Sequence, residues 1–178
     1  MAYFRQFYSM DEWRTLQFAP LWVFTAISAA DKKVSKKEVT ALAKEIAEAH
    51  LYKEPLVQEV LGSVGSDFEN VFRQYQADSR DVMRGLGDVA DLLESKAEAD
   101  QAKNFKMAML LMGRNIAEAS SKGLFGKKKM GDNEKAALVL VAYAGRTGLS
   151  AADDSDAVGA AAAPSVTESP RVVAGIQA

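Results

Sequence analysis

The sequence contains no cysteine and only one histidine, His50. The lack of cysteine excludes thiolate catalysis, disulfide bonds, zinc–thiolate sites and iron–sulfur clusters. A single histidine gives little support to an imidazole metal site or a nucleophile–base pair, so we expect His50 to serve a helix end or the surface. Neither a Walker A pattern nor GxGxxG occurs in the chain. These absences favour a protein that is not an enzyme.

An excess of positive charge is also missing, because the formal net charge is −2. Nucleic-acid-binding domains are usually basic, so we expect no nucleic-acid partner. The longest apolar run, residues 18–30, has thirteen positions, fewer than the roughly twenty that a membrane-spanning helix needs. The N-terminus lacks the basic-then-apolar layout of a secretory signal. We therefore expect no transmembrane segment and interpret the apolar run as a buried core helix.

Helical periodicity dominates the chain up to residue 149. Capping boxes of the type Ser-x-x-Glu at residues 9–12, 35–38 and 66–69 predict three helix starts. Pro20 predicts a kink or break at the residue before it. No segment alternates with period two for long enough to form a convincing strand. The pattern predicts an all-α fold of roughly seven or eight helices, the last of them at residues 134–144.

The composition changes at Ser150, where periodicity gives way to Ala, Asp, Ser, Val and Pro. Residues 1–149 are therefore predicted to form one helical domain. Residues 150–178 are predicted to be a low-complexity tail that is extended, and disordered when free. Residues 1–8 hold four aromatic side chains, and we expect this short segment to clamp onto its own domain.

An internal repeat links two parts of the domain. Residues 27–31 align with residues 116–120, and residues 34–38 align with residues 130–134. Both copies have an apolar helix with an alanine-rich end, a turn, a small N-cap residue and a glutamate that opens the next helix. One helix–turn–helix pair cannot bury its apolar face alone, whereas two pairs bury theirs against each other. The repeat predicts a bundle built from two pseudo-repeated helix–turn–helix halves.

The first turn resembles the tellurite-resistance TerB-like family. That family is marked by a turn of the type A-A-D-G-x-[IV]-[ST]-x-x-E between two helices, repeated in its second half. The matching residues are Ala29, Ala30, Asp31, Val34, Ser35 and Glu38, with a weaker second match of Ala119, Met130, Gly131 and Glu134. The resemblance spans roughly residues 20–149. It implies a cytoplasmic, all-helical fold of two related halves and a role in stress response or in scaffolding larger assemblies.

The resemblance also implies an acidic, metal-binding site made by the two turns. The acidic positions that carry over are Asp31, Glu38 and Glu134. Glu118 and Asp132 would add ligands if the halves face each other, and the cofactor would be a divalent cation such as calcium, which takes oxygen ligands. The structural alternative needs no cofactor: Glu38 closes a capping box and Asp31 satisfies turn amides. The lysines around Asp31 favour this structural interpretation.

A glycine-hinged loop, SSKGLFGKKK, spans residues 120–129. One interpretation is a solvated surface loop. The other is contact with a protein partner or with an anionic membrane surface, with two apolar anchors between the lysines. The residues expected to make this contact are Lys122, Leu124, Phe125, Lys127, Lys128 and Lys129.

Together these patterns favour a non-enzymatic helical interaction or scaffold module. It would be an accessory subunit of a larger assembly or of a stress-response system, and it would bind protein partners through the tail and the 120–130 loop. The alternative is a divalent-metal-binding stress protein of the tellurite-resistance type that uses its acidic inter-helix turns.

Overall fold

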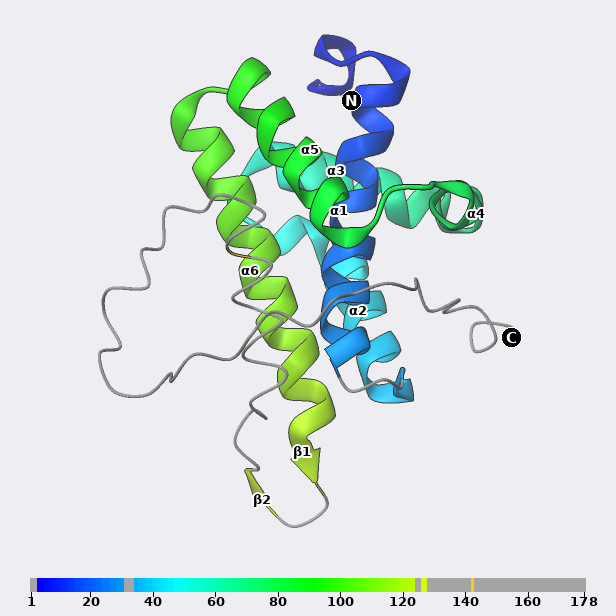
Figure 1. The fold of residues 1–178 in the computed structure, drawn as a ribbon. Helices are drawn as coiled ribbons and strands as arrows, with labels where there is room; N and C mark the ends of the chain where they lie inside the picture. The colour runs from blue at the N-terminus through cyan, green and yellow to red at the C-terminus, as the bar shows by residue number, and fades with distance from the viewer. Residues whose placement is uncertain (1–2, 31–33, 124–125, 128–141, 143–178) are drawn as a thin grey trace, which may run out of the picture.

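The computed structural model describes residues 3–30, 34–123, 126–127 and 142 (Figure 1). This part of the chain contains η1 (Arg5–Phe7), α1 (Met10–Ala30), α2 (Lys36–Ala47), η2 (Ala49–Leu51), α3 (Pro55–Ser66), α4 (Phe68–Ala77), α5 (Val82–Lys96) and α6 (Ala99–Ser121). After α6, β1 (Lys122–Gly123) and β2 (Gly126–Lys127) pair antiparallel as a two-residue ribbon within the expected loop. The prediction of an all-α fold is confirmed.

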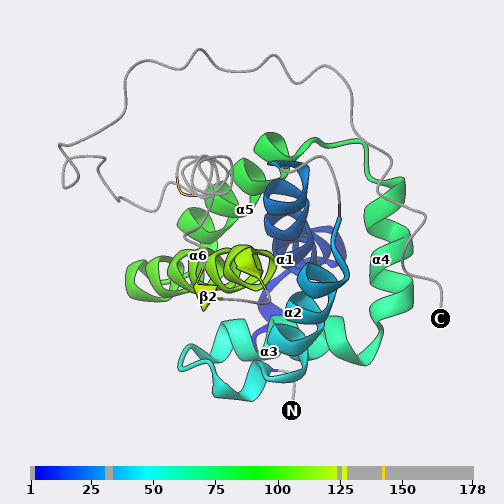
Figure 2. The same ribbon diagram turned by 90° about the horizontal axis from the view of Figure 1, so that it is seen from below.

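The central element is α1, which contacts each of the other five α-helices of the described chain. Its closest packing is with α5 and α6, and α4 lies on its other side (Figure 2). The side chains of Leu16, Phe18, Leu21, Trp22 and Ile27 are almost completely buried. A helix whose central turns are apolar and buried on nearly all sides belongs in the middle of a bundle.

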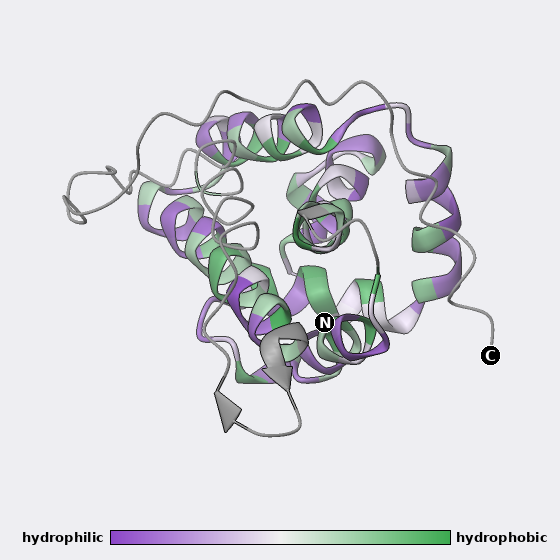
Figure 3. Cartoon of the chain, turned by 60° about the horizontal axis from the view of Figure 1, so that its bottom comes forward, coloured by the Kyte–Doolittle hydropathy of each residue, from purple (hydrophilic) through white to green (hydrophobic). Residues whose placement is uncertain are grey.

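The helices around α1 are amphipathic. Figure 3 shows hydrophilic and hydrophobic residues alternating along α4 and α6, as expected of helices with one buried face. On α6 the buried residues include Phe105, Met112 and Ile116, and the flexible methionine side chain is well suited to filling the core. Within the described residues, no helix is both long enough and apolar enough to cross a bilayer.

Of the kink or break predicted at Pro20, the break does not occur, because α1 runs without interruption from Met10 to Ala30. A proline inside a helix removes one hydrogen bond and costs about 3 kcal/mol. Burying one large apolar side chain contributes about 1.5–3 kcal/mol, and Pro20 lies between two such residues, Phe18 and Trp22. Packing of α1 against its neighbours therefore outweighs the local cost.

Two of the three predicted capping boxes are present. In the first, the Ser9 amide donates to Glu12 Oε2 at 2.7 Å and the Glu12 amide donates to Ser9 Oγ at 3.2 Å. In the second, the Ser35 amide donates to Glu38 Oε2 at 2.8 Å and the Glu38 amide donates to Ser35 Oγ at 3.2 Å. These boxes start α1 and α2 where the sequence places them.

The third predicted box, Ser66 to Glu69, is wrong. Ser66 is the last residue of α3 and its hydroxyl donates to the Ser63 carbonyl. Asp67 separates α3 from α4 and makes no side-chain cap hydrogen bond. Val64 is fully buried, and its packing carries α3 past Gly62 to its end at Ser66.

A close approach joins α1 to α5. A Cβ atom on Gly85 would lie 2.1 Å from the Trp22 ring, so only glycine fits at this crossing. The Arg80 guanidinium lies over the same ring, 4.8 Å from its centroid, and pairs with Asp78 and Asp88. The tryptophan is thus fixed between a glycine and a cation, which sets the position of α5 on the core.

Candidate functional site

The acidic residues predicted to bind a metal do not form a cluster in the described chain. Glu38 is fully buried, with Oε2 in the capping box and Oε1 without a hydrogen-bond partner. Glu118 lies on α6 and accepts from Arg114 Nε at 2.7 Å. Asp31, Asp132 and Glu134 lie outside the described residues. Among the residues that are described, no three acidic or imidazole side chains converge on a position for a metal ion.

The residues predicted to contact a partner fall partly in the described chain. The backbones of Lys122 and Lys127 are paired in the β1–β2 ribbon. Leu124, Phe125, Lys128 and Lys129 lie outside the described residues, as do the tail and all of the predicted helix at residues 134–144 except residue 142.

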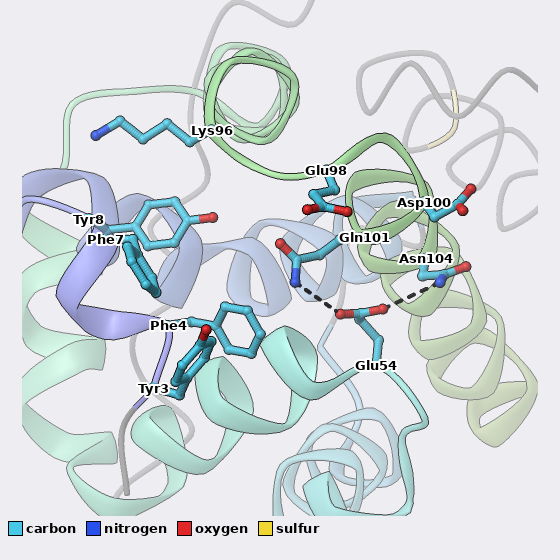
Figure 4. A pocket seen from close by; sticks show the side chains of 10 residues that line it. All are labelled: Tyr3, Phe4, Phe7, Tyr8, Glu54, Lys96, Glu98, Asp100, Gln101 and Asn104. Atoms are coloured by element: carbon cyan, nitrogen blue, oxygen red, sulfur yellow. Dashed lines mark hydrogen bonds between the residues drawn. The ribbon is translucent and has the colours of Figure 1, made fainter.

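A pocket that the sequence did not predict lies at the N-terminal end of α1 (Figure 4). Its volume is about 370 Å³. It forms where η1, the start of α3 and the junction between α5 and α6 meet. The lining residues are Tyr3, Phe4, Phe7, Tyr8, Glu54, Lys96, Glu98, Asp100, Gln101 and Asn104.

One wall of the pocket is aromatic and is held in place by Glu59 of α3. Its Oε2 atom accepts the amide protons of Tyr3 and Phe4, and its Oε1 atom accepts that of Arg5, all at 2.8 Å. Hydrogen bonds to a carboxylate are stronger than those between neutral groups. The expectation that residues 1–8 clamp onto their own domain is confirmed for the described residues of this segment. The backbone beneath the rings is therefore fixed.

The side chains of this wall are nevertheless exposed at its rim. The Tyr3 ring meets Phe4 and Phe7 edge-on, with centroids 5.0 and 5.5 Å apart. The exposed fraction is 60% for Tyr3 and 56% for Phe7. Large rings exposed on an anchored backbone are typical of surfaces that meet a partner.

Tyr8 forms the inner part of the same wall and is almost buried. Burial raises the pKa of its hydroxyl, and the nearby Glu12 charge raises it further, so Tyr8 stays a neutral phenol. Lys96 Nζ lies 5.9 Å from the Tyr8 ring centroid and donates to Glu12 Oε2 at 2.7 Å. That hydrogen bond is the main cause that lowers the pKa of Glu12, which therefore balances the charge of Lys96.

The opposite wall is acidic and comes from α3 and α6. Glu54, the N-cap of α3, accepts from Gln101 Nε2 at 3.4 Å and from Asn104 Nδ2 at 3.3 Å. Figure 4 shows Glu98 pointing into the space between these residues and the rings, whereas Asp100 lies farther from the rings. Within the described residues, none of these three carboxylates makes an ion pair.

The arrangement can hold a ligand between two walls of different chemistry. The lining has aromatic rings on one side and carboxylates on the other, and it includes no histidine, cysteine, serine or threonine. The sequence contains a signal for the aromatic wall of the pocket but none for the acidic wall. The aromatic run of residues 1–8 was a visible pattern, whereas Glu54, Glu59 and Glu98 are isolated surface glutamates until the fold brings them together.

Fold and pocket together define a class: an all-α bundle with a surface pocket at one end of its central helix. No family model matches the chain. The chain is 30% identical over 152 residues to a protein of Methanothermobacter thermautotrophicus named "Uncharacterized protein ORF11'", and the match covers 78% of this chain and 89% of that protein. The chain belongs to the same family as this protein. No solved structure matches the chain.

Proposed function

We propose that the chain is a non-enzymatic helical interaction module, an accessory subunit of a larger assembly or of a stress-response system. The observation that carries the proposal is the aromatic wall of the pocket. Tyr3 and Phe7 are more than half exposed, although Glu59 fixes the backbone that bears them. Exposing large rings to water is unfavourable, and a partner that covers them recovers that free energy.

The proposal includes the architecture implied by the resemblance to TerB-like proteins. In it, the two pseudo-repeated halves form a cytoplasmic bundle of roughly seven or eight helices, with a further helix at residues 134–144. The 120–130 loop and the tail at residues 150–178 add contacts for protein partners, and no nucleic acid is bound. The pocket adds a third contact surface to these two.

Two features support a role without catalysis. His50, the one histidine of the chain, is exposed on η2 and does not line the pocket. The titratable groups that line it are three carboxylates, one lysine and two tyrosines, and the lysine is paired with Glu12. Nucleophile–base pairs of the Ser–His, Cys–His or Thr type need residue types that this lining does not supply.

The test is a comparison of partners bound by matched variants. The full chain is purified with an affinity tag at its C-terminus from cells that express it, and so are the Tyr3→Ser/Phe7→Ser variant and a chain without residues 150–178. Met83→Ser is the control, because Met83 is 40% exposed and lies outside the pocket lining. We expect a partner that the parent and the control retain and that the ring variant or the shortened chain loses. Identical partner sets for all four proteins would overturn the proposal.

The second candidate function is binding of a divalent cation by the acidic turns. The observation in its favour is Glu38 Oε1, a fully buried carboxylate oxygen without a hydrogen-bond partner. The described residues alone do not make a calcium site, because calcium takes six to eight oxygen ligands and Glu118 is paired with Arg114. Asp31, Asp132 and Glu134 would have to complete the site.

Thermal unfolding with calcium or zinc tests this candidate. A cation that binds only the folded state raises its stability, and the rise grows with concentration. We expect the parent to gain stability and Asp31→Ala to gain none if the turns bind a metal. The candidate is rejected if millimolar calcium or zinc leaves the melting temperature of the parent unchanged.

A further inference from the structure

We infer that the pocket binds a basic side chain, an alkylammonium or guanidinium cation, presented by an extended segment of a partner protein. The inference deepens the proposed function and rests on it, because the pocket is one of the surfaces assigned there to partner binding.

The aromatic wall is built to accept a cation. The face of an aromatic ring carries negative charge density and attracts a cation within about 6 Å. Two cations of the chain already pack in this way at the same end of the molecule: Lys96 lies over Tyr8 at 5.9 Å and Arg5 over Trp13 at 5.7 Å. Phe4 and Phe7 line the same pocket and carry no such cation in the described chain.

The charge of the lining favours the same ligand. Glu54, Glu98 and Asp100 line the pocket and make no ion pair within the described residues, whereas the charge of Lys96 is already balanced by Glu12. Asp100 lies in the first turn of α6, and Figure 4 shows it farther from the rings than Glu98. Glu54 and Glu98 therefore carry the attraction for a cation in the pocket.

The hydrogen bonds of Glu54 leave room for a stronger donor. Gln101 and Asn104 donate to this carboxylate at 3.4 and 3.3 Å, and the backbone amide of Leu56 donates at 3.5 Å. These distances are long for hydrogen bonds to oxygen, which lie mostly between 2.7 and 3.2 Å. An ammonium or guanidinium group would form shorter, charge-assisted bonds to the same oxygens.

The size of the pocket and its exposed aromatic rim favour one side chain of a peptide as the ligand. The volume of about 370 Å³ is near the lower end of the range for ligand pockets, about 300–1,000 Å³, and suits one long side chain. Tyr3 and Phe7 extend the aromatic wall outward to the surface, where they would contact the residues flanking that side chain. Among the described residues no three metal-ligating side chains converge here, which favours an organic cation over a bare metal ion.

The test uses fluorescein-labelled peptides of sequence Gly-Gly-Lys-Gly-Gly and three counterparts in which arginine, norleucine or glutamate replaces lysine. Binding to the full chain is measured by fluorescence polarisation. We expect the lysine or arginine peptide to bind about tenfold more tightly than the norleucine peptide, as several cation–π and ionic contacts together allow, and the glutamate peptide to bind most weakly. Added salt should weaken the basic peptide selectively.

Two variants locate the site. Glu98→Gln removes one charge from an exposed side chain and should weaken the basic peptide about two- to fivefold, the range for an exposed ionic contact. Phe7→Leu removes a ring and should weaken it by about the same factor. The controls are Glu69→Gln and Met83→Leu, because both residues are exposed and lie outside the lining. They should leave the affinity unchanged.

The outcomes separate this inference from the proposed function. Equal binding of the lysine and norleucine peptides, with loss in Phe7→Leu, would overturn the cation and keep an apolar contact surface. Absence of peptide binding would overturn the inference. If the ring variant nevertheless lost a cellular partner, the proposed interaction module would still be supported. Absence of peptide binding together with identical partner sets would overturn both.

Discussion

The capping boxes that start α1 and α2 use the same pair of residues in two different environments. Glu12 is partly exposed, and its Oε2 atom serves both the Ser9 amide and Lys96 Nζ. Glu38 is fully buried, and only its Oε2 atom has a hydrogen-bond partner. The same local motif therefore has two different effects. At α1 its glutamate binds Lys96 at the end of α5, and at α2 its glutamate has one oxygen buried without a partner.

The free-energy cost of a capping glutamate therefore depends on its surroundings. A carboxylate at the surface keeps contact with water and gains a lysine at little expense. A buried carboxylate with an unpaired oxygen loses hydration without full compensation. Each box can be broken separately, and the sizes of the losses should differ.

The largest effect is expected for Glu38→Ala. It relieves the cost of the unpaired Oε1 atom, but it leaves a cavity where a fully buried side chain lay and removes the acceptor of the Ser35 amide. The two losses are larger, so the free energy of unfolding should fall by about 2–3 kcal/mol. Glu12→Ala should cost clearly less. Urea unfolding followed by circular dichroism measures both. Glu38→Gln, which retains shape and acceptor, should fall between Glu38→Ala and the parent, and equal losses for Glu12→Ala and Glu38→Ala would refute the comparison.

The serines of the two boxes come next. Ser35→Ala and Ser9→Ala each remove the side-chain acceptor of an N-cap, a loss worth about 0.5–2 kcal/mol. We expect Ser35→Ala to lie nearer the upper limit, because its box is less accessible to water that could replace the hydroxyl. The same denaturation assay applies. A larger loss for Ser9→Ala would reverse the ranking.

A pH series sharpens the comparison at Glu12. Its folded-state pKa is lowered from the usual 4.5, chiefly by the hydrogen bond from Lys96. A lowered folded pKa means that the stabilisation is complete above the unfolded pKa and is lost as the pH falls through the folded value. The difference in melting temperature between the parent and Glu12→Gln should therefore be constant near neutrality and shrink below about pH 4.5. A difference that persists at the acid end would exclude the ionic contribution.

The smallest effect is expected for Ser66→Ala. Ser66 has the spacing of a capping serine but occupies the last turn of α3, with its hydroxyl on the Ser63 carbonyl. An exposed substitution of this kind usually changes stability by no more than about 0.5 kcal/mol. Thermal melting of Ser66→Ala beside Ser9→Ala gives the comparison. A loss as large as that of Ser9→Ala would mean that Ser66 caps α4 after all.

The helices of the described chain were predictable because their determinants are local. The starts at Ser9 and Ser35 and the apolar stretch of α1 depend on residues a few positions apart. The capping box predicted at Ser66 was wrong because the four-residue pattern does not include Val64, whose burial extends α3. The break at Pro20 did not occur for a similar reason. The free-energy cost of a proline in a helix is local, whereas the packing that offsets it involves distant residues.

The pocket was less predictable than the helices. The rings of residues 3–8 form a visible cluster, but their positions depend on Glu59, more than fifty residues away. Glu54 and Glu98 come together only because α3 and α6 pack at the same end of α1. Contacts between distant segments depend on the whole fold. Rules based on residue spacing within one segment do not predict them.

The position of α1 at the centre of the bundle has a consequence for synthesis on the ribosome. The helix leaves the exit tunnel early, whereas α5 and α6, its closest packing partners, follow much later in the chain. Until α6 emerges, residues such as Phe18, Leu21 and Trp22 have no complete core to enter and are available to chaperones. Protease digestion of ribosome-bound chains stalled before and after α6 should show α1 protected only in the longer chain.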